Sequence, residues 1–123
     1  MTDHRRHSRI PVRQRVWCEG DQVTLFVQMW NVSRGGLFVR TASSPPVGDR
    51  LRVTWSDRTQ GEVVLQTVVV WSRREPSGSQ PGMGLRIAGV EGGAAAFERF
   101  LSRAEVDLGD ALDDTGLGDD APD

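Results

Sequence analysis

The fold is most clearly indicated by residues 23–36, VTLFVQMWNVSRGG. Apolar residues occupy alternate positions from Val23 to Met29, a period of two that is typical of a half-buried β-strand. After Trp30, five of the six residues Asn31–Gly36 are polar or glycine, so they predict a turn into another strand. The stretch therefore favours antiparallel β-structure.

Similar short runs lie on both sides of this stretch, separated by residues that favour turns. Six short strands at close spacing predict an all-β fold, either a barrel or a sandwich. A closed six-stranded antiparallel barrel is favoured because closure removes exposed sheet edges. The predicted strands cover residues 11–18, 23–30, 36–41, 51–55, 62–74 and 83–87.

The chain after the last predicted strand divides into a helix and a tail. Apolar residues in 94–103 recur at helical spacing and predict an amphipathic helix of about three turns across one face or opening of the barrel. Residues 104–123 contain eight acids and no base, together with glycine and proline, which predicts a disordered acidic tail. The expected organisation is an arginine-rich arm (1–10), a barrel with its helix (11–103) and this tail.

Composition limits the classes of protein that remain. The first 103 residues carry 15 arginines against 9 acids, and the chain has no lysine. One cysteine, Cys18, excludes an internal disulfide and favours a reducing cytoplasm. The longest apolar run is too short to span a bilayer, and the basic N-terminus is not followed by the apolar run of a signal peptide, so we expect a cytoplasmic protein with no membrane insertion.

Two polar clusters are the candidate binding residues. Arg5, Arg6 and Arg9 lie within five residues, and a guanidinium can donate to the O6 and N7 of guanine or fork onto a phosphate. Taken alone, this cluster is more typical of a solvated basic terminus than of a ligand site. The histidines at positions 4 and 7 lack the companions of a metal site, so neither a metal nor an enzyme is indicated.

The second cluster is Asn31-x-Ser33-x-x-Gly36. It combines an amide, a hydroxyl and two glycines, and Gly35 and Gly36 allow a positive φ and close approach of a ligand to the backbone. Successive N–H groups in such a turn can form an anion-binding nest. Taken alone, the cluster is also typical of an ordinary hairpin turn.

The order and spacing of these clusters resemble the PilZ domain family. The family's Arg-Arg-x-x-x-Arg arm is matched at Arg5 and Arg9, with His4 in place of the first arginine and Arg6 one position away. The (Asp/Asn)-x-Ser-x-x-Gly motif matches in full, and the segments GLFV (36–39), VVVW (68–71) and GMGLRI (82–87) are similar to PilZ strands. The resemblance covers roughly residues 4–103.

This resemblance implies a six-stranded Greek-key barrel with a C-terminal helix that binds the bacterial second messenger cyclic di-GMP (c-di-GMP), often as an intercalated pair. It further implies a receptor that relays ligand level to a downstream protein through ordering of its arm, with no cofactor. Trp71 is interpreted either as an aromatic that stacks on a guanine or as a core residue. The implied ligand-binding residues are Arg5, Arg9, Asn31, Ser33 and Gly36, with Arg6, Arg34, Gly35 and Trp71 as additional candidates.

Two other functions remain open at this stage. His4 at the first arginine position favours a PilZ-like adaptor that has lost nucleotide binding and acts in motility or pilus function. The basic body of the chain is compatible with nucleic-acid binding, but the acidic tail and the lack of interleaved surface aromatics and bases argue against it.

Overall fold

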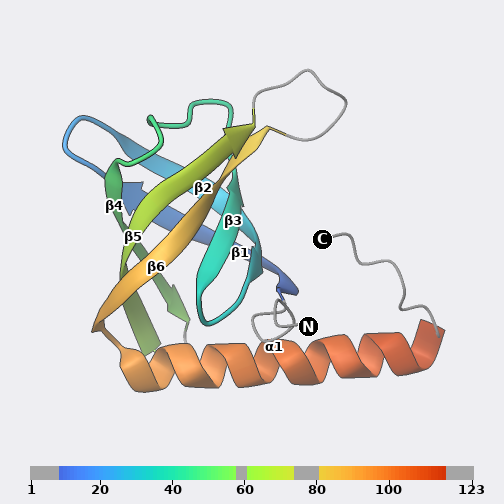
Figure 1. Ribbon diagram of the computed structural model, residues 1–123. Helices are drawn as coiled ribbons and strands as arrows, with labels where there is room; N and C mark the ends of the chain where they lie inside the picture. Colours follow the sequence, from blue (N-terminus) through green and yellow to red (C-terminus); the bar gives the residue numbers. More distant parts are fainter. Residues whose placement is uncertain (1–8, 58–60, 74–80, 116–123) are drawn as a thin grey trace, which may run out of the picture.

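Six β-strands form a closed barrel, and one α-helix runs across an end of it (Figure 1). The computed structural model describes residues 9–57, 61–73 and 81–115. The elements are β1 (Ile10–Glu19), β2 (Thr24–Val32), β3 (Gly36–Arg40), β4 (Arg50–Asp57), β5 (Gly61–Arg73), β6 (Gly82–Gly92) and α1 (Ala94–Thr115).

The barrel has the strand order β1-β2-β3-β6-β5-β4, and every neighbouring pair is antiparallel. Pairing of β1 with β4, with Trp17 opposite Thr54, closes the ring. After β3 the chain crosses to β4, which lies next to β1. Strands β5 and β6 then follow in order until β6 pairs with β3, which gives the connectivity of a Greek key. The predicted six-stranded antiparallel barrel with a C-terminal helix is confirmed.

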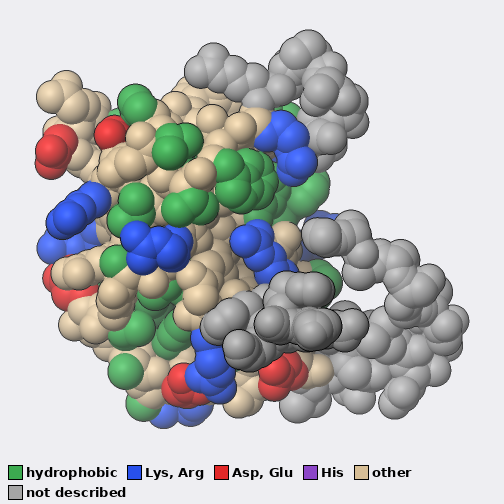
Figure 2. Space-filling view, viewed as in Figure 1, with side chains coloured by type: hydrophobic (Ala, Val, Ile, Leu, Met, Phe, Trp, Pro, Cys, Tyr) green, Lys and Arg blue, Asp and Glu red, His purple; other side chains and the backbone are tan. Residues whose placement is uncertain are grey.

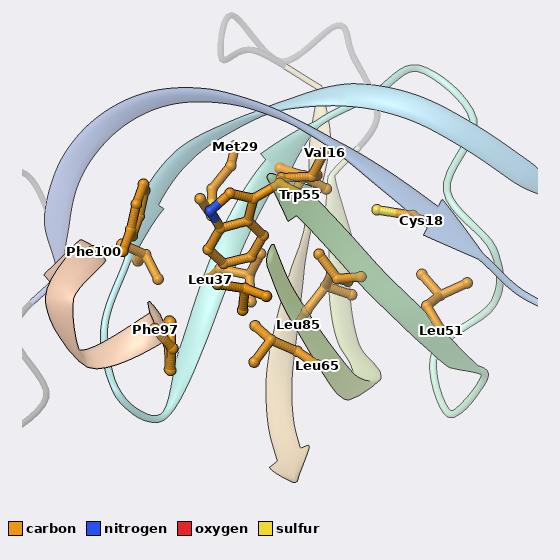
Figure 3. Close-up of a cluster of buried hydrophobic side chains, with 14 of the residues drawn as sticks. Val16, Cys18, Met29, Leu37, Leu51, Trp55, Leu65, Leu85, Phe97 and Phe100 are labelled. Carbon is orange, nitrogen blue, oxygen red and sulfur yellow. The ribbon is translucent and has the colours of Figure 1, made fainter. Parts of the chain in front are cut away.

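The core fills the barrel and continues beneath the helix (Figure 3). Trp55 lies between the barrel interior and α1, with its ring 6.1 Å from that of Phe97 and 5.1 Å from that of Phe100, both at edge-on angles. Cys18 is buried in the same core, and this burial raises the pKa of its thiol to about 12. The cysteine is therefore a small core residue, because a thiol with this pKa is protonated at neutral pH.

Gly93 sets the angle at which the helix leaves the last strand. Its φ is 78°, and a Cβ at this position would lie 1.9 Å from the carbonyl oxygen of Glu62. The N–H of Phe97 donates to the Gly93 carbonyl at 2.8 Å, so the first turn of α1 begins directly at this glycine. The turn thus directs the aromatic side of α1 onto the barrel.

Two boundaries differ from the sequence prediction by more than two residues. Residues 104–115, predicted as part of a disordered tail, continue α1 to Thr115, because Leu108 and Leu112 extend the periodicity of the preceding turns and lengthening a helix is easier than starting one. Strand β6 continues to Gly92 beyond the predicted end at residue 87, since bulges in its pairing with β5 accommodate the glycines.

Within the described part of the chain, no helix has the length and apolarity needed to cross a membrane.

Candidate functional site

The base of the arginine arm lies beside the Asn31–Gly36 cluster. Strand β1 begins at Ile10, which pairs with Val32 at the end of β2. The guanidinium of Arg9 donates from Nη1 to the Asn31 Oδ1 at 3.2 Å, and this contact is exposed to solvent. The two motifs, 22 residues apart in sequence, therefore meet in the structure.

The Ser33 hydroxyl organises the turn between β2 and β3. It accepts the N–H groups of Gly35 and Gly36, each at 3.2 Å, and donates to the Gly36 carbonyl at 3.3 Å. The Ser33 N–H also donates to that carbonyl, at 2.8 Å. Because a hydroxyl has one donor and two acceptor positions, all of its capacity is used within the turn. A direct contact between Ser33 and a ligand stays a prediction, and it requires one of these bonds to be exchanged.

The two glycines act differently from the sequence expectation. Their N–H groups point to the Ser33 hydroxyl, so the predicted anion-binding nest is wrong for this conformation. The described glycines with a positive φ are Gly48, Gly61 and Gly93, so neither Gly35 nor Gly36 adopts this conformation. A Cβ on Gly36 would instead lie 2.7 Å from the Leu85 carbonyl oxygen of β6, so Gly36 is required for close approach of β3 to β6.

Arg34 connects this turn to the helix. Its guanidinium forms an ion pair with the Glu98 carboxylate on α1, although both side chains remain more than half exposed. The hydrogen bond and charge of Glu98 raise the pKa of Arg34 above its ordinary value, and Glu105 adds a smaller effect in the same direction. The turn that carries the second motif is thereby tied to an acidic side of α1.

A row of side chains crosses the outer surface of the barrel from the same motif. Asn31 on β2 is opposite Phe38 on β3, which is opposite Gly84 on β6, which is opposite Trp71 on β5. Directly opposed residues share one face of a sheet, and three strand spacings separate Asn31 from Trp71 by about 14 Å. The interpretation of Trp71 as a core residue is therefore wrong, and its contact with a ligand stays a prediction.

The outer row is aromatic because glycines on β6 leave room for flat rings. A Cβ on Gly84 would lie 2.3 Å from the Trp71 indole nitrogen, and one on Gly82 would lie 2.4 Å from the Phe38 ring. Trp71 and Phe38 stack with centroids 5.4 Å apart and an interplanar angle of 17°. Trp30 meets the edge of Phe38 at 6.3 Å. We call Trp30, Phe38 and Trp71 the aromatic platform.

Arginines border this platform. The Arg73 guanidinium lies 5.3 Å from the Trp71 ring and 5.4 Å from the Phe38 ring, and Arg40 lies 5.1 Å from the Trp30 ring. Figure 2 shows blue arginine side chains beside green hydrophobic ones on the face formed by β3, β6 and β5. Phe38 is only 4% exposed, whereas Trp30 and Trp71 are half-buried. A cation over a ring contributes roughly 0.5–2 kcal/mol, which is small enough for a ligand contact to replace it.

Two residues of the predicted site, Arg5 and Arg6, lie outside the described residues, as do both histidines. Of the predicted site, the structure describes Arg9, Asn31, Ser33, Arg34, Gly35, Gly36 and Trp71. In the described ranges no group of three or more His, Cys, Asp or Glu side chains is placed to hold a metal ion.

Residues 3–103 match the PilZ domain family. The chain belongs to the PilZ domain family. The PilZ domain of YcgR from Escherichia coli, solved with c-di-GMP, has the same fold with a TM-score of 0.68 and 14% identity, over 90% of this chain and 98% of that one. A search of curated protein sequences returned no match.

A second solved structure with a similar fold belongs to a longer chain. The Bacillus subtilis inhibitor of motility (MotI/DgrA) superposes with a TM-score of 0.64 and 19% identity over 82% of this chain. The match spans only 53% of the MotI/DgrA chain, about half of its length. At these identities both neighbours show the fold alone.

Sequence reasoning missed two features of the site. Phe38 was not singled out, although Leu37 and Val39 alternate with it and point into the core, which places Phe38 outside. The partnership of Arg34 with Glu98 joins residues 64 apart and has no local signal. The alternation was available in the sequence, whereas the ion pair depends on where α1 lies against the barrel.

Proposed function

We propose that this chain is a c-di-GMP receptor domain that relays ligand level to a partner protein. The observation that carries the proposal is the hydrogen bond between Arg9 and Asn31, because it joins the base of the arginine arm to the second motif on a PilZ barrel. The c-di-GMP present in the structure of the YcgR domain, which has the same fold, supports this ligand class.

The arginine arm provides the guanine and phosphate contacts. Arg5 and Arg9 present paired N–H donors to the O6 and N7 of a guanine, or to the oxygens of a phosphate. Adenine has an amino donor where guanine has O6, so the same arginines disfavour an adenine ligand. Phosphate contacts make the affinity dependent on salt concentration.

The motif and the platform border the remaining ligand surface. Asn31 accepts from Arg9 through its oxygen, and its amide nitrogen offers two further donors to a base or ribose. Trp71 offers an outer aromatic surface in the same cross-strand row, and stacking of a base there contributes roughly 1–3 kcal/mol. Arg73 shifts from the rings to an anionic ligand or stays above them as a stacked cation.

Ligand binding fixes residues 1–10 against the barrel and so changes the surface available to a partner. The arm joins β1 at Ile10, next to the turn that follows Val32, so its placement alters the end of the barrel that α1 also occupies. A population shift of this kind requires only that the ligand favours one placement of the arm over the others.

A PilZ-like adaptor that has lost nucleotide binding is the second candidate. The observation that favours it is His4 at the position of the family's first arginine. A histidine has no fork of donors and is largely neutral at pH 7, so one contact of the arm is weaker. If the protein is such an adaptor, Arg5 and Arg9 without a first arginine are not sufficient to bind c-di-GMP.

Titration calorimetry with c-di-GMP and cyclic di-AMP separates the two candidates. The receptor predicts binding in the micromolar range or tighter for c-di-GMP, much weaker binding of cyclic di-AMP, and loss of c-di-GMP binding in Arg9→Ala. Arg13→Ala is the matched control, because Arg13 is an exposed arginine on β1, the strand that directly follows Arg9. Absence of heat and of a thermal shift at high c-di-GMP would favour the adaptor.

A further inference from the structure

The contact between Arg34 and Glu98 joins the ligand-binding motif to α1. Arg34 lies between Ser33 and Gly35, within the motif, and its guanidinium pairs with a carboxylate of the helix. The rest of the contact between α1 and the barrel involves apolar residues such as Phe97 and Leu101. Among the hydrogen bonds and ion pairs of the described residues, Arg34–Glu98 is thus a polar tie between the motif and the helix.

The surroundings of this pair are unfavourable for an anion while Glu98 holds Arg34. Glu98 and Glu105 lie seven residues apart, which places them on one side of α1, and both act on the Arg34 pKa in the same direction. A ligand phosphate that approaches the turn meets these two carboxylates and an arginine that is already paired. The phosphate and Glu98 therefore require the same guanidinium.

The exchange of partners is energetically accessible. Both side chains of the pair are more than half exposed, at 63% for Arg34 and 54% for Glu98. Exposed ion pairs contribute little to stability and are screened by salt. A phosphodiester of c-di-GMP offers the fork of a guanidinium two oxygens and one negative charge, as a carboxylate does, so it can take the place of Glu98 on Arg34.

We propose that Glu98 is an internal competitor for the ligand: its carboxylate holds Arg34 in the ligand-free protein, and a phosphate of the bound ligand replaces it. Binding then removes the polar tie between the β2–β3 turn and α1, and the helix side around Glu98 becomes available to a partner. The effect is reciprocal: a partner that binds Glu98 raises the affinity for the ligand by the same factor as the ligand raises the affinity for that partner. This inference rests on the proposed receptor function.

Calorimetric titration of c-di-GMP at low salt tests the exchange in four proteins. Glu98→Gln is expected to bind about two- to fivefold more tightly than wild type, the range that an exposed ion pair supports. Arg34→Gln is expected to bind about tenfold more weakly, because a charged contact to phosphate is lost. In the Arg34→Gln background, Glu98→Gln should produce no further change.

The matched control is Glu91→Gln. Glu91 pairs with Arg52 at 3.1 Å on β6 and β4, in an exposed ion pair of the same type that is remote from the motif, so its loss should leave the affinity unchanged. Thermal unfolding of every variant checks that the fold is retained.

The outcomes separate this inference from the receptor function. Binding by wild type with an unchanged or weaker Glu98→Gln overturns the competitor and leaves the receptor intact. An equal gain from Glu98→Gln with and without Arg34 also overturns it, because Glu98 then acts by repulsion at a distance. Absence of c-di-GMP binding by wild type overturns both.

Discussion

Two tryptophans show how differently the barrel uses its interior and its outer face. Trp55 is 3% exposed and is enclosed by two phenylalanines of α1, whereas Trp71 is half-buried, lies flat over Gly84 and stacks on Phe38. The interior contact is fixed by packing from all sides. The outer contact has an arginine as its cover, so it can be exchanged. The comparison shows that the interior ring is held by packing against α1, whereas the outer rings are held partly by contacts with an arginine.

Trp55 is also the site of an unmet polar group. Although the side chain is buried, no group in the described part of the chain accepts a hydrogen bond from its indole N–H. A buried donor without a partner costs about 1–3 kcal/mol, so the packing of this ring has to exceed that cost. The position thus offers a direct way to measure how strongly the core holds α1.

Replacing Trp55 is expected to have the largest effect on stability. Trp55→Ala should lower the free energy of unfolding by about 3–5 kcal/mol, because it leaves a cavity beneath Phe97 and Phe100. Trp55→Phe should cost much less, since it keeps an aromatic ring and removes the unpaired N–H. Chemical denaturation measures both, and an equal loss in the two variants would contradict the importance of packing.

Replacing Trp71 is expected to change binding more than stability. Trp71→Ala should weaken c-di-GMP binding by roughly 1–3 kcal/mol through loss of stacking. Trp17→Ala is the matched control, because Trp17 is 48% exposed on β1 and stacks only partly on Phe26, at a centroid distance of 4.6 Å. Calorimetry on both variants checks the prediction, and equal affinities would exclude the aromatic platform from the site.

The sequence predicted the interior better than the outer face. Alternation from Val23 to Met29 identified a strand, and the strands together indicated the barrel, because burial imposes a period of two on strands such as β1 and β5. Glycines at 89 and 92 concealed the true end of β6, since local propensity disfavours them in a strand while bulges in the pairing with β5 accommodate them. The end of β6 is therefore set by its pairing with β5, which local sequence patterns do not indicate.

The candidate site was predictable to a similar extent. The order and spacing of the two motifs indicated that they contribute to one site, and the structure adds the direct contact between Arg9 and Asn31. The internal role of the Ser33 hydroxyl did not, because the same Ser and Gly residues suit a ligand or a self-contained turn equally well. Contacts made by α1 to the motif depended on a helix position that only the folded chain defines.

Whether the two motifs form one binding site is tested most directly by a double-mutant cycle on Arg9 and Asn31, measured as c-di-GMP affinity by titration calorimetry. A shared site predicts that Arg9→Ala and Asn31→Ala each weaken binding by at least about tenfold, and that the double variant loses clearly less than the product of the two effects. Unchanged affinity in Arg9→Ala, or effects that multiply fully, would contradict a single site built from both motifs.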